Sequence, residues 1–144
     1  MPIQLKTKLK EGDIRPLARA DFDRAVDDIP PYPGGFKGRG ITICGGGHTY
    51  FTNAWILIRM LRKLGCGLPI QLWYYGADEL DEEMAELVSP YGVECVDAKA
   101  IAKRYKRKIS PGWPLKPLSI LYSPFEEVLA LDCLLYTSPS PRDS

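Results

Sequence analysis

The chain has 144 residues, with 19 Lys and Arg against 18 Asp and Glu and with 45% hydrophobic side chains. This length allows one domain at most, and a net charge of +1 argues against a dedicated nucleic-acid binder, which usually has a strong basic excess. No apolar run approaches the ~18 residues that span a membrane, and no apolar block follows the N-terminal lysines. We therefore expect no membrane segment and no secretory signal, and a location that is cytoplasmic or unknown.

Residues 1–39 have weak hydrophobic periodicity and many helix breakers. We expect a short helix near 21–27 and an extended lead-in, which together form an N-terminal arm packed on a domain that starts near Gly40. From there a short β-branched run, 40–44, predicts a buried strand that ends in three consecutive glycines, Gly45, Gly46 and Gly47.

The next segments alternate between the two kinds of periodicity. Thr52 or Asn53 can cap a helix that Gly65 ends as a left-handed cap. A second helix begins in the acidic residues from Asp78 onward, where negative charge complements the positive helix pole. The remaining elements are strands at 69–75, 93–96 and 127–131, a helix capped by Asp97 that runs to about Tyr105, and a helix from Pro117 to about Tyr122.

Strands that alternate with helices in this way predict an α/β fold with an open, mostly parallel sheet and flanking helices. Ligands on such sheets bind beyond the carboxyl ends of the strands. Two features lie at strand ends of this kind, namely the glycine triplet after the first strand and Asp132 after the fourth. We expect both at the binding site.

The glycine triplet has two interpretations. Unrestricted φ would let backbone approach a phosphate or nucleotide closely, but a plain tight turn is equally consistent with the sequence. The pattern is not a dinucleotide fingerprint, because Tyr50 stands where the third glycine belongs, and no GK[ST] follows. His48 either touches a substrate or makes a local hydrogen bond.

Lys116 lies at the start of a predicted helix, where the positive helix pole disfavours a lysine unless an anion binds there too. A solvated surface lysine is the alternative. Asp132 is a candidate ligand for a hard cation such as Mg²⁺ or Mn²⁺, or a turn former. The basic run 103–108 is read as a solvated helix end in preference to a nucleic-acid patch.

The four cysteines lack metal-ligand spacing, and two lie in apolar runs, so we expect buried thiols in a reducing compartment: Cys44, Cys66, Cys95 and Cys133. His48 is the single histidine, which excludes a multi-histidine metal site.

The last twelve residues read CLLYTSPSPRDS, and their back-translation fits a transposase adapter from a sequencing library. We interpret 133–144 as an adapter-derived tail and 40–132 as a truncated nucleotide-sugar-binding half-domain. If the adapter begins one base earlier, the gene encodes Asp or Glu at position 132. A genuine Ser/Pro-rich disordered tail is the alternative.

Four stretches together resemble a mannosyltransferase family related to fungal α-1,3-mannosyltransferases, within the GT-A nucleotide-sugar transferases. They are GRGITICGGG (38–47), NAWILIRMLRKLGCGLPIQLWYYG (53–76), GVECVD (92–97) and GWPLKPLSILYSPFEEVLALD (112–132). Asp132 falls on the first aspartate of that family's Asp-x-Asp motif, whereas the second position has Leu134. Lys116, sixteen residues earlier, falls on a lysine that contacts the sugar nucleotide in glycogenin-type transferases.

The resemblance implies Mn²⁺ or Mg²⁺ and transfer of a hexose from GDP-mannose or a UDP-hexose to a glycan or protein acceptor, with retained configuration. The candidate donor-binding residues are Gly45, Gly46, Gly47, His48 and Lys116, and the candidate metal ligand is Asp132. Catalytic residues stay unassigned. Fungal relatives are anchored in the Golgi, and no such anchor is expected here.

We therefore expect the donor-binding half of a glycosyltransferase, inactive and marginally folded as a 144-residue chain. Two alternatives stay open at this point. One is a non-catalytic α/β nucleotide-binding or interaction module. The other, a nicotinamide-dependent oxidoreductase, is disfavoured by Tyr50.

Overall fold

The computed structural model describes residues 11–29, 31 and 34–133. The chain divides into two compact units, residues 1–35 and 36–144. In the first unit, helix α1 (Glu11–Asp27) begins ten residues before the predicted helix. Exposed ion pairs of Arg19 with Asp23 at 3.1 Å and Arg24 with Asp21 at 3.4 Å support its last turns. The expected packing of an N-terminal arm on the following domain stays a prediction.

The second unit contains the predicted sheet, and every strand pair in it is parallel. Its four strands are β1 (Arg39–Cys44), β2 (Ile70–Tyr74), β3 (Val93–Asp97) and β4 (Glu127–Asp132), in the spatial order β3-β2-β1-β4. The expected α/β class is therefore confirmed. The sequence predicted each strand to within one residue at either end, because short runs rich in β-branched and aromatic residues identify strands well.

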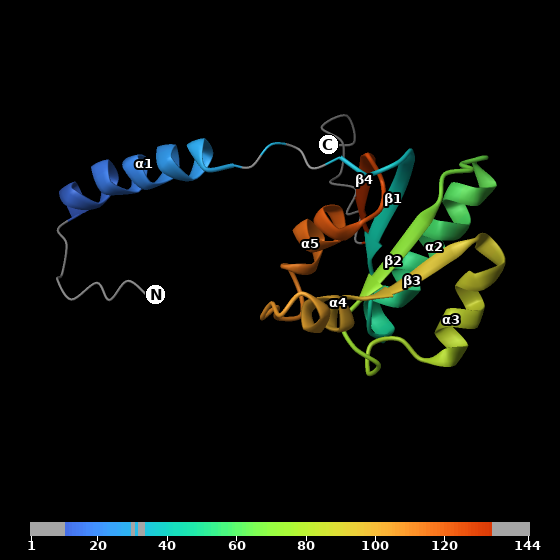
Figure 1. Cartoon of the computed structure of the whole chain (residues 1–144). Helices are drawn as coiled ribbons and strands as arrows, with labels where there is room; N and C mark the ends of the chain where they lie inside the picture. Colours follow the sequence, from blue (N-terminus) through green and yellow to red (C-terminus); the bar gives the residue numbers. More distant parts are fainter. Residues whose placement is uncertain (1–10, 30, 32–33, 134–144) are drawn as a thin grey trace, which may run out of the picture. The chain divides into compact units, whose positions relative to one another are not determined.

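Helices cover both faces of the sheet (Figure 1). Helices α2 (His48–Lys63) and α3 (Glu82–Val88), with the 3₁₀ turn η1 (Ser89–Tyr91), pack on one face. Helices α4 (Ala98–Arg104) and α5 (Leu115–Tyr122) pack on the other.

Side chains that alternate along β1 separate the two apolar cores. Ile41 and Ile43 are fully buried against α2 and α3. Thr42 and Cys44 point to the opposite face, where Ser119 of α5 lies within hydrogen-bond distance of both. Both faces of the central strands are thus covered, as parallel sheets require. No helix among the described residues is long and apolar enough to cross a membrane.

Three helix starts differ from the predicted ones. Helix α2 begins at His48 because Gly47, at φ +77°, turns the chain directly into it; Thr52 donates instead to the His48 carbonyl at 2.9 Å. Helix α3 begins after Asp81, whose carboxylate accepts from the Met84 N–H at 2.8 Å. The acidic residues before Asp81 therefore lie in a loop. Helix α5 starts at Leu115, which places Lys116 inside its first turn.

Other predicted ends are confirmed. Gly65 follows α2 with φ +82°, and its N–H donates to the Arg62 carbonyl at 3.1 Å. Asp97 caps α4 by accepting from the Lys99 N–H at 2.8 Å.

Strand β1 has neighbours on both sides that the chain reaches through connections running in opposite directions. From β1 the connection runs to β2 on one side, whereas β4 lies on the other. Crossovers on either side of such a strand separate at its carboxyl end and leave a crevice there. In this sheet the crevice lies between β1 and β4, whose last residues, Cys44 and Asp132, are register partners.

Candidate functional site

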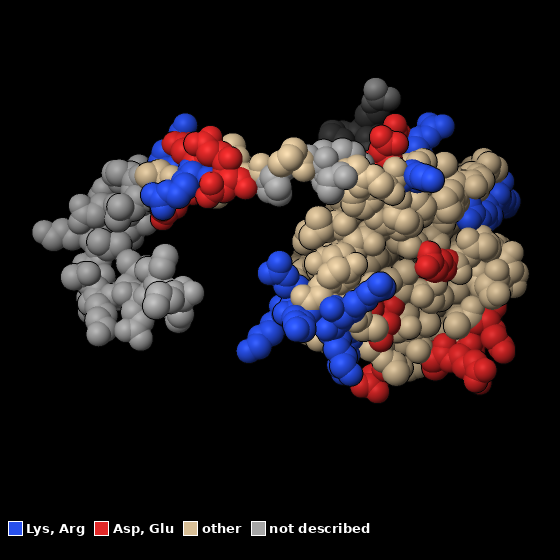
Figure 2. Space-filling view, in the orientation of Figure 1, with Lys and Arg blue, Asp and Glu red and all other residues tan. Residues whose placement is uncertain are grey.

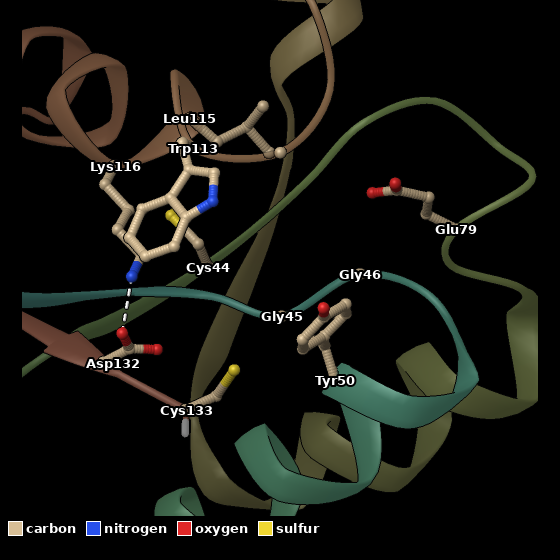
Figure 3. Close-up of a pocket in the computed structure, with 11 residues that line it drawn as sticks. Cys44, Gly45, Gly46, Tyr50, Glu79, Trp113, Leu115, Lys116, Asp132 and Cys133 are labelled. Carbon is tan, nitrogen blue, oxygen red and sulfur yellow. Dashed lines mark hydrogen bonds and ion pairs between the residues drawn. The ribbon is translucent and has the colours of Figure 1, made fainter. Parts of the chain in front are cut away.

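A pocket of about 200 Å³ lies at this crevice (Figure 3). It is smaller than the roughly 300–1,000 Å³ of pockets that enclose whole drug-sized ligands, so it fits one part of a larger molecule. Four segments line it: the end of β1 with the start of α2, the loop after β2, the end of β4, and the loop before α5 with the first turn of that helix. The lining residues are Cys44, Gly45, Gly46, Tyr50, Glu79, Gly112, Trp113, Leu115, Lys116, Asp132 and Cys133.

The pocket contains four of the six residues that the sequence singled out. Gly45, Gly46, Lys116 and Asp132 line it. Gly47 and His48 do not: Gly47 forms the turn into α2, and the His48 side chain is exposed at the start of that helix. The four lining residues come from β1, α5 and β4, which adjacent parallel strands bring to one edge of the sheet.

The glycine triplet serves close packing as much as ligand access. A side chain on Gly45 would meet the Ala54 methyl group of α2 at 2.6 Å, and one on Gly46 would overlap the Glu79 carboxylate. The Gly45 and Gly47 amides donate to the carbonyls of Trp73 at 3.1 Å and Glu79 at 2.7 Å. Among the described residues only the Gly46 amide of the triplet has no acceptor, so within the triplet only that amide is left to donate to a ligand.

Lys116 and Asp132 form an ion pair across the crevice. The lysine Nζ lies 2.5 Å from Asp132 Oδ2, and it also lies 4.4 Å from the centre of the Trp113 ring. Both side chains keep more than a third of their surface exposed, at 37% and 40%, so water screens the pair. The lysine therefore keeps part of its surface exposed at the pocket, and the pair contributes little stability.

Trp113 was not among the candidate site residues of the sequence. In the structure its ring forms one wall of the pocket while remaining 81% exposed. Exposed indole rings are uncommon in a packed domain and frequent where flat ligands stack or where a protein meets a partner. The Trp113 ring and the Lys116 ammonium lie next to each other at the rim of the pocket (Figure 3). The ring gives the rim an apolar surface, and the ammonium gives it a positive charge.

Tyr50 and Glu79 are pocket residues that the sequence did not indicate. Tyr50 projects from the first turn of α2, half-exposed. Glu79 lies in the loop after β2, where its Oε2 accepts from the Tyr75 N–H at 2.7 Å. Neither has a sequence signal, because the position of the first turn of α2 and the conformation of the loop after β2 are both fixed by tertiary packing.

Cys44 forms part of the pocket wall without being an activated nucleophile. Burial raises the pKa of its thiol above the usual 9.0, although a hydrogen bond with Ser119 and the charge of Lys116 oppose this shift. A raised pKa keeps the sulfur protonated at neutral pH, and the thiolate is the reactive form. All four cysteines are half-buried, which is less burial than the sequence predicted.

Comparisons with known proteins bear on the family of this chain. Residues 38–139, which include every strand and the whole pocket, match the family described as "Mannosyltransferase putative". No solved structure matches the chain.

Three curated relatives are fungal enzymes. The alpha-1,2-mannosyltransferase MNN2 of Saccharomyces cerevisiae is 31% identical over 130 residues, which cover 87% of this chain and 22% of that protein. The Candida albicans alpha-1,2-mannosyltransferases MNN2 and MNN21 are 32% and 28% identical, over 67% and 82% of this chain and 17% and 20% of their own lengths.

The chain thus spans about a fifth of the length of these relatives. Their names give an α-1,2 linkage, whereas the sequence resemblance was to a family related to α-1,3 enzymes, and we assign no linkage here. Because the family match covers well over half of the chain and contains the entire sheet, this protein belongs to that mannosyltransferase family.

Proposed function

We propose that the pocket binds the diphosphate of a nucleotide sugar, and that the chain is the donor-binding part of a GT-A type transferase. The proposed reaction transfers a hexose from GDP-mannose or a UDP-hexose to a glycan or protein acceptor. Mannose is the first candidate for this hexose because of the family. The observation that supports this most is the meeting of Lys116, Asp132 and the Gly46 amide at the β1–β4 crevice.

The chemistry of the site suits a diphosphate. A nucleoside diphosphate leaving group gains negative charge as the glycosidic bond breaks, and a fixed cation stabilises that charge. Lys116 supplies the cation at the first turn of α5, where the positive helix pole acts in the same direction. The nearby Trp113 ring offers an apolar surface to the sugar or the base.

The donor set for a divalent metal is partial in this chain. Carboxylate oxygen suits Mn²⁺ or Mg²⁺, and Asp132 places one at the strand end beside the lysine. The described residues contain no group of three or more His, Cys, Asp or Glu side chains that could hold a metal ion. Asp132 would therefore hold the ion together with diphosphate oxygens and water, and the ion would neutralise charge on the leaving group.

We further propose that the 144-residue chain binds its donor without turning it over. From the resemblance to the mannosyltransferase family we expect a second aspartate at position 134, where this sequence has leucine. The non-catalytic nucleotide-binding module is the alternative, and its donor binding would be independent of metal.

A ³¹P NMR titration of GDP-mannose and of UDP-glucose with the chain, with and without Mg²⁺, tests both readings. We expect binding in the millimolar range, strengthened by the metal. Turnover by the chain alone would contradict the incomplete site, and metal-independent binding would favour the module. No phosphorus shift at any concentration would refute the donor site.

A further inference from the structure

The helices that cover one side of the sheet also carry a surface that the donor site does not use. Five basic side chains lie within six residues at the end of α4 and in the loop after it, and all five are exposed. They are Lys103, Arg104, Lys106, Arg107 and Lys108. Figure 2 shows basic side chains gathered over α4 and the following loop, beside an area without charged side chains over α5.

An apolar stripe runs along the adjacent outer surface. Its members recur at the spacing of one helical face and are all exposed: Trp113, Pro117, Ile120 and Leu121. The opposite side of α5 is the one that packs in the core, through Leu115 and Ser119. Leu121 is 65% exposed, so α5 has apolar side chains that contact water and do not pack in the core.

The two sets of residues lie on neighbouring elements. The Tyr105 and Tyr122 rings, at the ends of α4 and α5, stack with their centres 4.8 Å apart. The Tyr75 hydroxyl donates to the Ile109 carbonyl at 2.8 Å and so ties the connecting loop to the sheet. We call the five basic residues and the four stripe residues together the basic–apolar face.

Helix-end electrostatics account for only part of this charge. The negative pole of a helix amounts to about half an elementary charge, which two cations in the last turn, Lys103 and Arg104, already exceed. Among the described residues the ion pairs involve α1 and the Lys116–Asp132 pair, and none reaches the five basic residues. Their charge is therefore available to a partner.

Lys106 provides an independent observation. Helices α2 and α4 end in the same way, with the residue after the cap in the left-handed region and its N–H bonded back into the last turn. In α2 that residue is Gly65, whereas in α4 it is Lys106 at φ 52°. Side chains beyond glycine are disfavoured there, so a lysine is retained at a position where glycine would be more stable.

We propose that the basic–apolar face docks on an anionic lipid surface. Basic residues beside exposed Trp and Leu side chains have the composition of interfacial membrane-binding segments, in which headgroups attract the cations and the acyl boundary accepts the apolar groups. A soluble polyanion would use the cations but leave the stripe in water. Trp113 belongs to both the face and the pocket wall, so docking places the pocket beside the lipid headgroups.

Vesicle flotation with the full chain tests this. We expect binding to vesicles of phosphatidylcholine mixed with phosphatidylserine, and none to phosphatidylcholine alone. The double variant Arg107→Glu/Lys108→Glu should weaken partitioning by roughly 25-fold or more, because each cation at an anionic surface contributes about a fivefold factor. Its matched control, Arg59→Glu/Lys63→Glu, exchanges two exposed residues of α2 on the other side of the sheet and should leave binding nearly unchanged.

Two further variants separate binding from folding. Leu121→Ser should weaken partitioning roughly tenfold, whereas Leu64→Ser, at an 80% exposed leucine after α2, should not. Lys106→Gly should raise the thermal midpoint or leave it unchanged and still weaken partitioning about fivefold.

Equal binding to both vesicle types, or no binding to either, would overturn the proposal. Tight binding of dextran sulfate would also overturn it, if the Leu121→Ser variant bound dextran sulfate as tightly as the unmodified chain. These results together would identify a soluble polyanion as the partner. None of these results would bear on donor binding, which the phosphorus titration measures separately.

Discussion

Lys116 and Asp132 are sixteen residues apart in the chain, yet Lys116 Nζ lies 2.5 Å from Asp132 Oδ2 at the carboxyl edge of the sheet. The contact arises because α5 begins at that edge, runs back along the sheet, and is followed by β4, which returns to it. One helix and one strand of similar length thus bring the two residues together. A partly exposed ion pair of this kind contributes little stability.

Replacing Lys116 should affect ligand binding far more than folding. We expect Lys116→Ala to weaken GDP-mannose binding by roughly tenfold or more, as loss of a charge-assisted contact costs about 1.5–3 kcal/mol. The free energy of unfolding should change by less than about 1 kcal/mol. Isothermal calorimetry and urea unfolding measure the two effects. His48→Ala is the control, since its exposed side chain does not line the pocket and its loss should leave affinity unchanged.

Leu134→Asp should increase the metal dependence of donor binding. A second carboxylate two residues after Asp132 would supply another hard oxygen ligand. We expect Mn²⁺ to strengthen binding of GDP-mannose to this variant by roughly tenfold more than to the unmodified chain, as second ligands commonly do. Manganese relaxation enhancement of water protons measures the ion directly. Leu134→Asn tests whether the charge is needed, and equal enhancement by both variants and the unmodified chain would contradict a metal site here.

Gly46→Ala should destabilise the second unit through Glu79. The added methyl group would overlap the Glu79 carboxylate and lie 2.9 Å from its Cβ. Overpacking of this kind typically costs about 1–3 kcal/mol. Because Glu79 supplies the two nearest atoms and the Tyr74 Cβ is next at 3.0 Å, Glu79→Ala should restore part of the lost stability in the double variant. Urea denaturation of all four chains of the cycle gives the coupling energy, and a value of zero would mean that the clash is relieved elsewhere.

The Cys44 thiol should make stability depend on pH in the alkaline range. Burial raises its pKa in the folded state above the ordinary 9.0 of the unfolded chain. The stabilising contribution is therefore fully present below pH 9.0 and is lost as the pH rises through the higher folded value. We expect the free energy of unfolding to fall less steeply above pH 9.0 in Cys44→Ala than in the unmodified chain. Parallel slopes for the two proteins would refute this assignment.

The sequence predicted the elements well and the pocket only in part. Strand periodicity identified β1 to β4 nearly residue by residue, and the resemblance indicated the Lys116–Asp132 relationship. The helix starts were less accurate, because a cap depends on the conformation of one residue: Gly47 at φ +77° starts α2 earlier than either predicted capping residue. No pattern indicated Tyr50 or Glu79, which reach the pocket from the first turn of α2 and from the loop after β2.

Local chemistry along the chain thus determined the α/β class, the parallel strands and the family, since periodicity, turn residues and motif spacing are properties of neighbouring residues. The strand order β3-β2-β1-β4 was decided only in three dimensions, and with it the crevice between β1 and β4. Packing also decided which backbone amides of the glycine triplet have no acceptor within the protein. The amides of Gly45 and Gly47 donate to other backbone groups, so among the described residues of the triplet only the Gly46 amide has no acceptor. These outcomes depend on contacts between residues far apart in the chain, which no local pattern encodes.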